Sequence, residues 1–148
     1  MSELILALDQ GTTSSRSILF NEKAEIQAMA SASLECSYPE SGWVEQDPEE
    51  IWSTQRNTIE MVLAEAGITM GDITAVGITN QRETTIAWNR ETGEALCPAI
   101  NWQCRRTADF CDSLKAEGFD QLINERTGLV TDPYFSGTKM HWILENVP

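Results

Sequence analysis

Hydroxyl-bearing and charged residues are concentrated in the octapeptide Asp9–Arg16, which follows the apolar run Leu4–Leu8. Because Mg²⁺ prefers oxygen ligands, Asp9 at the end of a buried strand is suited to reach a hydrated magnesium ion. Gly11 has no side chain and lets backbone N–H groups approach phosphate oxygens, while Arg16 adds a guanidinium fork that matches phosphate. Three further residues contribute hydroxyl donors: Thr12, Thr13 and Ser14. The segment therefore has the chemistry of a phosphate-binding turn with a metal ligand.

The same octapeptide is also typical of an ordinary hairpin turn, in which Gly and Thr occupy the bend and Asp9 is a turn former. Taken alone, the segment favours neither interpretation. It matches neither the Walker phosphate loop nor the Gly-x-Gly-x-x-Gly pattern of dinucleotide-binding folds. Those two nucleotide-binding architectures are therefore not predicted.

A second pair of charged residues, Arg82 and Glu83, follows another apolar run, Ile73–Ile78. A guanidinium only donates hydrogen bonds and an ionised carboxylate only accepts them, so the pair can hold a ligand that carries hydroxyl groups. An ordinary ion pair at the end of a strand, worth about 0–1 kcal/mol, is the alternative. From these residues alone, the ion pair is the favoured interpretation.

The elements that would position these residues are read from apolar periodicity. Continuous or alternating apolar runs predict five strands: Leu4–Leu8, Ser17–Phe20, Glu25–Leu34, Ile73–Ile78 and Thr85–Trp88. The first three follow one another closely and predict an antiparallel meander. A helix between the third and fourth strands would make the sheet mixed, so the predicted fold class is α/β.

Helix signals are clearest between Asp47 and Gly67. Asp47 is placed as N-cap, Pro48 follows at the first helical position, and Gly67 ends the apolar stripe. The predicted stripe contains Ile51, Trp52, Ile59, Val62, Leu63 and Ala66. Three later helices are predicted over 105–117, over 119–126 and from about Gly137 onward, with a loop over 128–135.

The net charge of the chain is −13, from 23 acidic residues against ten Lys and Arg. Such a surface repels nucleic acids and anionic membranes, so neither is an expected partner. No apolar run approaches the ~20 residues of a membrane helix. The start Met1-Ser2-Glu3, followed by the short run Leu4–Leu8, does not resemble a signal peptide, and we expect a cytoplasmic location.

The cysteines and the single histidine do not form a metal-binding pattern. There is no Cys-x-x-Cys pair, and a zinc site needs closer ligand spacing than these residues have. Cys104 and Cys111 lie seven residues apart, which in a helix places both on one face, so we predict that they are buried in the core. His141, within the last predicted helix, is assigned a structural role.

Four motifs, taken together and in order, resemble the FGGY carbohydrate kinases of the actin/hexokinase/Hsp70 superfamily. These are Asp9–Arg16, Gly77–Thr85, Trp102–Thr107 and Thr127–Ser136. The segment Tyr134-x-Ser136-x-x-Lys139-Met140-x-Trp142-Ile143-x-Glu145-Asn146 also fits the first signature pattern of that family. The resemblance runs from one end of the chain to the other. Within the family it points to the members that phosphorylate glycerol, because kinases for pentoses carry a different segment at Asn80–Thr84.

The resemblance implies a role for each group of polar residues. By resemblance, Arg82, Glu83 and Tyr134 would bind glycerol, and the apolar ring of Trp102 makes it a fourth candidate. The charged pair would meet the hydroxyl groups, while Trp102, with Phe135 as a further candidate, would face the C–H edge. Four others would bind the nucleotide: Thr12, Thr13, Ser14 and Arg16. Asp9 would hold Mg²⁺, and the catalytic general base, an aspartate, would lie beyond Pro148.

The resemblance also implies the fold, the domain organisation and the activity. The fold would be a partial ribonuclease H-like (actin-like ATPase) domain, with an antiparallel meander in a mixed sheet plus helices. Residues 1–148 would form an incomplete N-terminal kinase domain, inactive alone, with the C-terminal nucleotide-binding domain missing. The full-length protein would be a homo-oligomer that uses MgATP to phosphorylate glycerol to glycerol 3-phosphate. The alternatives are another polyol or sugar kinase of the family and a truncated, non-catalytic binding module.

Overall fold

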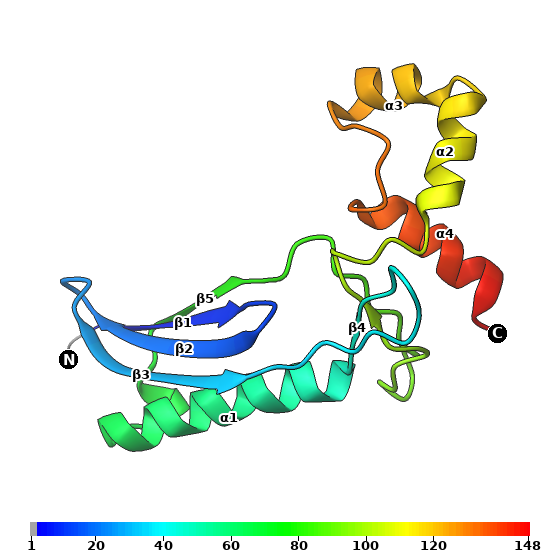
Figure 1. The fold of residues 1–148 in the computed structure, drawn as a ribbon. Coiled ribbons are helices and arrows are strands. Elements are labelled where there is room, and N and C mark those ends of the chain that lie inside the picture. The colour runs from blue at the N-terminus through cyan, green and yellow to red at the C-terminus, as the bar shows by residue number, and fades with distance from the viewer. Residues whose placement is uncertain (1–2) are drawn as a thin grey trace. The chain divides into compact units, whose positions relative to one another are not determined.

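The computed structural model describes residues 3–148, so Met1 and Ser2, part of the start that lacks signal-peptide character, lie outside the described residues. The chain divides into two compact units, and Figure 1 labels strands β1–β5 and helices α1–α4. Unit 1 contains the described residues through Cys36 together with Asp47–Gln81, and unit 2 contains Ser37–Gln46 and Arg82–Pro148. No helix within residues 3–148 has the length and apolar character required to cross a lipid bilayer.

Unit 1 is built on a four-stranded mixed sheet with the strand order β3-β2-β1-β5. Its strands are β1 (Leu4–Gln10), β2 (Ser14–Asn21), β3 (Ile26–Ser33) and β5 (Ala75–Thr79). The first three form the predicted antiparallel meander, and β5 pairs with β1 in parallel. Because parallel strands need a crossover, a helix lies between β3 and β5 in the sequence. β5 begins two residues later than predicted, because Ile73 closes the short 3₁₀ helix Met70–Asp72.

That crossover helix is α1 (Pro48–Ala66), and both of its predicted ends are confirmed. The Asp47 carboxylate accepts a hydrogen bond from the Glu49 backbone N–H at 2.9 Å, satisfying a donor that the first turn leaves free. Gly67 has a φ of 65°, a left-handed conformation that glycine adopts without the strain of a side chain. α1 lies along the sheet and contacts β2 and β3 (Figure 1).

The core of unit 1 lies between α1 and the sheet. Its buried apolar side chains are Leu6, Leu19, Ala28, Ala30 and Val62. The predicted stripe on α1 is wrong at Trp52, whose side chain is 59% exposed, whereas Gln55 and Thr58 are buried instead. The reason is that the part of β2 facing this half of the helix carries Ser15 and Ser17, and buried hydroxyl groups need polar partners.

A layer of buried hydrogen bonds therefore joins β2 to α1. The hydroxyl oxygens of Ser17 and Thr58 lie 2.8 Å apart. The Gln55 amide donates to the hydroxyls of Ser17 and Thr58 at 3.1 and 3.2 Å, and to the Arg16 carbonyl at 3.1 Å. α1 thus holds the strand that carries the predicted phosphate-binding turn.

Replacing Thr58 with valine is expected to lower the free energy of unfolding by about 1–2 kcal/mol, because buried partners lose a hydrogen bond. Urea unfolding measures the change. Ser53→Ala is the matched control, since the exposed Ser53 hydroxyl donates only to the Glu50 carbonyl of its own helix. Equal effects of the two substitutions would contradict the structural role of this layer.

Unit 2 combines three helices, one short strand pair and long irregular segments. Its elements are β4 (Glu45–Gln46), β6 (Ala99–Ile100), α2 (Ala108–Ala116), α3 (Phe119–Thr127) and α4 (Ser136–Asn146). β4 and β6 pair antiparallel, and neither was predicted, because strands this short have no detectable periodicity. The three helices and the loop between α3 and α4 are confirmed. Figure 1 shows this loop leading from α3 back to the start of α4.

The Arg106 side chain is a central contact of unit 2. Its guanidinium lies 3.8 Å from the centre of the Trp43 ring and 4.6 Å from that of Trp142, and it donates to the Glu45 carboxylate at 2.6 Å. A desolvated guanidinium between two indole rings gains cation–π attraction in addition to its ion pair. This contact fixes α4 to the segment that contains β4.

The predicted strand Thr85–Trp88 is wrong. Thr85 and Ile100 exchange both backbone hydrogen bonds at 2.9 Å, and Trp88 forms a second isolated bridge with Ala95. Between these bridges the opposing segment contains Pro98, which has no N–H to donate to a ladder. Local pairing therefore stops after one residue.

α2 begins three residues later than predicted. The Arg105 N–H donates to the Gly42 carbonyl at 2.7 Å, which draws the chain out of a helical path before Ala108. Cys104 and Cys111 are both buried, as predicted, but only Cys111 lies in the helix. His141 stacks on Phe110, with ring centres 4.2 Å apart, in agreement with a structural role.

Candidate functional site

The predicted phosphate-binding turn connects β1 to β2 in unit 1. Gly11, Thr12 and Thr13 form the bend, and Ser14 is the first residue of β2. The Gly11 N–H donates to the Ser14 carbonyl at 2.9 Å, so it closes the turn and does not point to a ligand as expected. A Cβ atom at Gly11 would lie 3.0 Å from that carbonyl oxygen, which explains the glycine by close backbone approach.

Asp9 and Arg16 face each other across this hairpin. They are paired residues of β1 and β2, and one guanidinium nitrogen lies 3.8 Å from the Asp9 carboxylate. Both side chains are nearly half exposed. One accessible carboxylate suits Mg²⁺, which keeps several waters and binds few protein oxygens. Asp9 therefore fits the predicted metal ligand, with the Arg16 guanidinium beside it.

In unit 2, Glu83 follows β5 by a few residues and binds the first turn of α4. Its Oε2 atom accepts hydrogen bonds from the backbone N–H and the hydroxyl of Ser136, at 2.8 and 2.7 Å. A carboxylate is favoured at a helix N-terminus, where backbone donors have no partner within the helix. Within residues 3–148, Oε1 accepts no hydrogen bond. One oxygen is thus held by the protein, while the other accepts no hydrogen bond from the described residues.

The surroundings of Glu83 favour its ionised form. The Ser136 hydroxyl holds the pKa of this carboxyl below its usual range, helped by the Ser136 N–H, Lys139 and Arg82, while burial works in the opposite direction. Glu83 is therefore ionised at neutral pH and can only accept hydrogen bonds. Its φ of 67° is unusual for a residue with a side chain and costs about 1–2 kcal/mol.

Three aromatic rings belong to segments that are hydrogen-bonded to the Glu83 segment. The Trp102 and Tyr134 rings meet edge to face with centres 5.8 Å apart, and Tyr134 and Phe135 do so at 5.1 Å. We call the Trp102 and Tyr134 rings the Trp102–Tyr134 wall. The Trp102 backbone N–H donates to the Thr84 hydroxyl at 3.2 Å, which links this wall to the residue after Glu83. The structure thus brings together three of the predicted glycerol residues within unit 2.

Arg82, the fourth of these residues, is exposed. The described residues 3–148 contain no Arg82–Glu83 salt bridge, so the ordinary ion pair considered as an alternative is absent. Each charged group is instead available to a ligand: the Glu83 carboxylate through Oε1, and the Arg82 guanidinium through its exposed donors.

Lys139, one turn into α4, was not predicted as a site residue. It is fully buried, and its ammonium donates to the backbone carbonyls of Glu83, at 2.9 Å, and Tyr134. Burial lowers the pKa of Lys139 to about 8. A lysine on a helix is normally exposed, so composition gave no sign of this role. The only signal was its fixed spacing from Tyr134 and Ser136 in the quoted signature.

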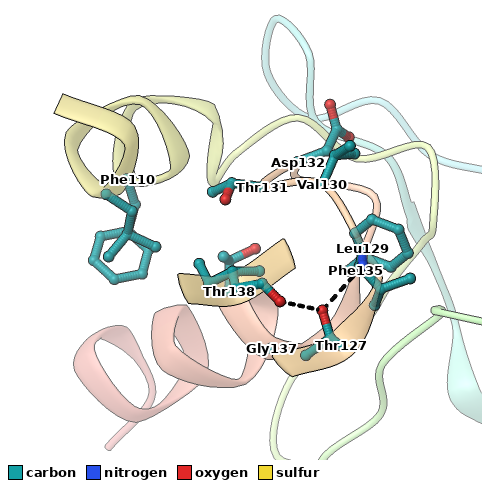
Figure 2. A pocket seen from close by; sticks show the side chains of 11 residues that line it. Phe110, Thr127, Leu129, Val130, Thr131, Asp132, Phe135, Gly137 and Thr138 are labelled. Atoms are coloured by element: carbon teal, nitrogen blue, oxygen red, sulfur yellow. Dashed lines mark hydrogen bonds between the residues drawn. The ribbon is translucent and has the colours of Figure 1, made fainter. Parts of the chain in front are cut away.

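The pocket in Figure 2, of about 360 Å³, also lies within unit 2, but it does not coincide with this polar cluster. Mainly apolar residues line it, with Phe110 on one side and Leu129 and Phe135 on the other (Figure 2). Neither Glu83 nor Tyr134 is among its lining residues. The polar cluster, and not this apolar pocket, therefore marks the candidate site.

Comparison with known sequences gives consistent matches along the chain. Glycerol kinases from Shewanella amazonensis and Vibrio campbellii are 54% and 56% identical to it over 146 and 143 residues. These matches cover 99% and 97% of this chain but 30% and 28% of the relatives. The chain thus spans about 30% of the length of the curated relatives it matches.

Solved structures agree with the fold. A Plasmodium falciparum glycerol kinase with ADP superposes with a TM-score of 0.90 at 32% identity, over 99% of this chain and 29% of that one. A xylulose kinase from Rhodospirillum rubrum gives 0.86 at 26% identity, over 97% and 29%. These neighbours confirm the predicted α/β fold of a partial actin-like ATPase domain.

The model of one protein family matches residues 4–148, nearly the whole chain. It describes the N-terminal domain of the FGGY family of carbohydrate kinases. The four motifs, the fold and this match all indicate the same family. The chain belongs to the FGGY family of carbohydrate kinases.

Proposed function

We propose that the full-length protein transfers the γ-phosphoryl group of ATP to a terminal hydroxyl of glycerol and forms glycerol 3-phosphate. The observation that carries this proposal is the Glu83 carboxylate, which is held at α4 through Oε2 and keeps Oε1 for a ligand beside the Trp102–Tyr134 wall. The two bacterial glycerol kinases are 54% and 56% identical to the chain, the Plasmodium falciparum glycerol kinase 32% and the xylulose kinase 26%, an order that supports glycerol over a pentose.

At the glycerol site, Glu83 would accept a hydrogen bond from one hydroxyl group and Arg82 would donate to hydroxyl oxygens. The Tyr134 hydroxyl can donate or accept, and the Trp102 ring would cover the C–H edge of the molecule. A polyol that lacks one hydroxyl would leave a buried polar group unpaired, which can cost up to about 10⁴-fold in discrimination. These residues orient the attacking hydroxyl.

At the phosphate turn, Thr12, Thr13 and Ser14 would donate hydrogen bonds to phosphate oxygens, and Arg16 would neutralise their charge. Asp9 would hold Mg²⁺, which supplies charge neutralisation during phosphoryl transfer. Because the chain carries a net charge of −13, local donors of this kind are needed to retain an anion. We assign no catalytic base among residues 3–148.

The direct test is phosphoryl transfer by the full-length protein in the presence of MgATP, with glycerol, xylulose and gluconate compared at equal concentrations. Glycerol is expected to give the highest kcat/KM, and faster turnover of either other substrate would overturn the assignment. The 148-residue chain alone is expected to consume no ATP with glycerol, as an incomplete N-terminal domain would. ATP turnover by that chain would contradict the proposal that residues 1–148 form an incomplete domain.

Arg82→Ala in the full-length protein is expected to raise the KM for glycerol by about 10- to 100-fold, since a charged hydrogen bond is worth about 1.5–3 kcal/mol. The KM for ATP should stay within about twofold, because Arg82 is assigned to the polyol and not to the nucleotide. Steady-state kinetics with each substrate varied separately measures both. Arg90→Ala, at another exposed arginine, is the matched control. An equal loss toward glycerol and ATP would argue against the assigned role.

We further propose that the full-length protein is a cytoplasmic homo-oligomer whose partners are glycerol, ATP and ADP, and which binds neither nucleic acid nor membranes. The strongly negative charge supports the last part, because it disfavours anionic surfaces. Analytical ultracentrifugation of the full-length protein tests the oligomeric state, and a monomer at all concentrations would contradict it.

A further inference from the structure

Lys139 is the largest fully buried side chain of the described residues, and it carries an ionisable group into the interior of unit 2. We propose that Lys139 is a positioning residue of the glycerol site, whose ammonium group ties the backbone of Glu83 to that of Tyr134. The proposal rests on the proposed function, because it concerns how the glycerol-binding groups are held.

The contacts of Lys139 join two distant parts of the sequence. Its Nζ donates to the Glu83 carbonyl at 2.9 Å and also to the Tyr134 carbonyl. These carbonyls belong to two residues that would touch glycerol, one through its carboxylate and the other through its ring and hydroxyl. The Lys139 ammonium, bound to both backbones, therefore sets the separation of the two glycerol-binding groups.

Glu83 is held at both ends. Lys139 binds its carbonyl, while the N–H and hydroxyl of Ser136 bind its carboxylate. Its backbone has a φ of 67°, a conformation that residues with side chains adopt only when the surroundings impose it. Ser136 and Lys139 lie one turn apart on α4, so the same helix supplies both contacts. α4 thus imposes the conformation in which Glu83 presents Oε1.

A charged group is a costly way to fill space in a protein interior, where an apolar side chain of the same size often gives equal or greater stability. The carbonyl groups satisfy two of the ammonium donors directionally, which an apolar side chain would not do. The titratable groups facing Lys139 are Glu83, Asp132, Cys104 and Cys111, and burial outweighs their attraction in lowering its pKa to about 8. Lys139 is therefore better explained as a group that holds two backbone carbonyls in place than as a side chain that fills space.

The test is Lys139→Met in the full-length protein, which keeps the length of the side chain and removes its donors. The KM for glycerol should rise by about 10- to 100-fold, the effect of a small displacement of binding groups, while the KM for ATP stays within about twofold. Lys115→Met is the matched control, because Lys115 is exposed and pairs only with Asp112 on its own helix. A folded Lys139→Met protein with an unchanged KM for glycerol would overturn the proposal.

Two further measurements separate positioning from filling of space. In Lys139→Ala, propylamine should lower the KM for glycerol, because a small ammonium ion can enter the space left by the side chain, whereas butane should not. In the wild type, the KM for glycerol should rise as pH increases through about 8, where Lys139 loses its charge. If the variants do not fold, a KM that is constant from pH 7 to about 9.5 contradicts the proposal.

Amide hydrogen exchange tests the contact without any substrate. The Ser136 N–H, which donates to Glu83, should exchange at least about tenfold faster in Lys139→Met than in the wild type, and not in Lys115→Met. Faster exchange in a protein that does not phosphorylate glycerol would refute the proposed function and leave the positioning role intact. A protein that does phosphorylate glycerol, with KM and exchange unchanged by Lys139→Met, would refute the positioning role alone.

Discussion

Replacement of Glu83 by alanine in the full-length protein is expected to lower kcat/KM for glycerol by about a thousandfold. Removing one charged partner from a hydrogen-bonded site that the ligand closes off from water costs about 2–5 kcal/mol, and 4 kcal/mol corresponds to roughly this factor. The loss combines two effects, since the substitution removes the ligand acceptor Oε1 and releases Ser136 at the start of α4. Steady-state kinetics with glycerol varied at saturating MgATP measures it.

The left-handed backbone at Glu83 allows activity to be separated from stability. Alanine keeps the strain of a φ of 67°, whereas glycine adopts this conformation freely. Glu83→Gly should therefore have a free energy of unfolding about 1 kcal/mol higher than that of Glu83→Ala, and the two variants should be equally inactive. If activity instead followed stability through the two variants, the carboxylate would have no direct role.

Ser136→Ala gives a graded comparison. It removes one of the two hydrogen bonds that hold Oε2 and keeps the carboxylate and the backbone N–H of the helix. We expect a loss of about tenfold in kcat/KM, the value of one hydrogen bond to a charged group. Glu91→Ala, at an exposed position of unit 2, should leave kinetics unchanged. A greater loss in Ser136→Ala than in Glu83→Ala would reverse the assigned order of the two residues.

Features set by neighbouring residues were predictable from the sequence. Asp47 and Gly67 mark the ends of α1 because capping depends on the first and last turns alone. The β1–β2–β3 meander followed from short connections, which leave consecutive strands few ways to pair. The candidate site residues were selected by resemblance, and the structure adds that the Glu83, Trp102 and Tyr134 segments lie together in unit 2.

Features set by distant residues were not predictable. The burial of Gln55 in place of Trp52 depends on serines in β2, and the single bridge at Thr85 depends on Pro98 in the opposing segment. Burial of Lys139 was the least predictable of these features, because a lysine in a helical pattern is normally predicted to be exposed. Its interior position follows only from two carbonyl groups that the fold brings to it.

Asp9→Asn carries the other large expected effect, a loss of about a thousandfold in kcat with the KM for glycerol within about twofold. A metal ion contributes several kcal/mol to stabilising the charge of a transferring phosphoryl group, and a neutral amide holds Mg²⁺ less strongly than a carboxylate. The ion pair with Arg16, 3.8 Å long and nearly half exposed, is worth at most about 1 kcal/mol and cannot explain such a loss. Kinetics at increasing Mg²⁺ should recover part of the rate.

The competing explanation is that Asp9 only orients Arg16 across the hairpin. A double-mutant cycle with Arg16→Ala decides between the two. If Asp9 acts through Arg16, the double variant should be no worse than Arg16→Ala, and Mg²⁺ should rescue none of the variants. If Asp9 holds the metal, the two losses should largely add and only Asp9→Asn should respond to Mg²⁺. Asp109→Asn, at an exposed acid on α2, controls for the change in net charge. An Asp9→Asn protein with normal kcat and normal Mg²⁺ dependence would remove Asp9 from the metal site.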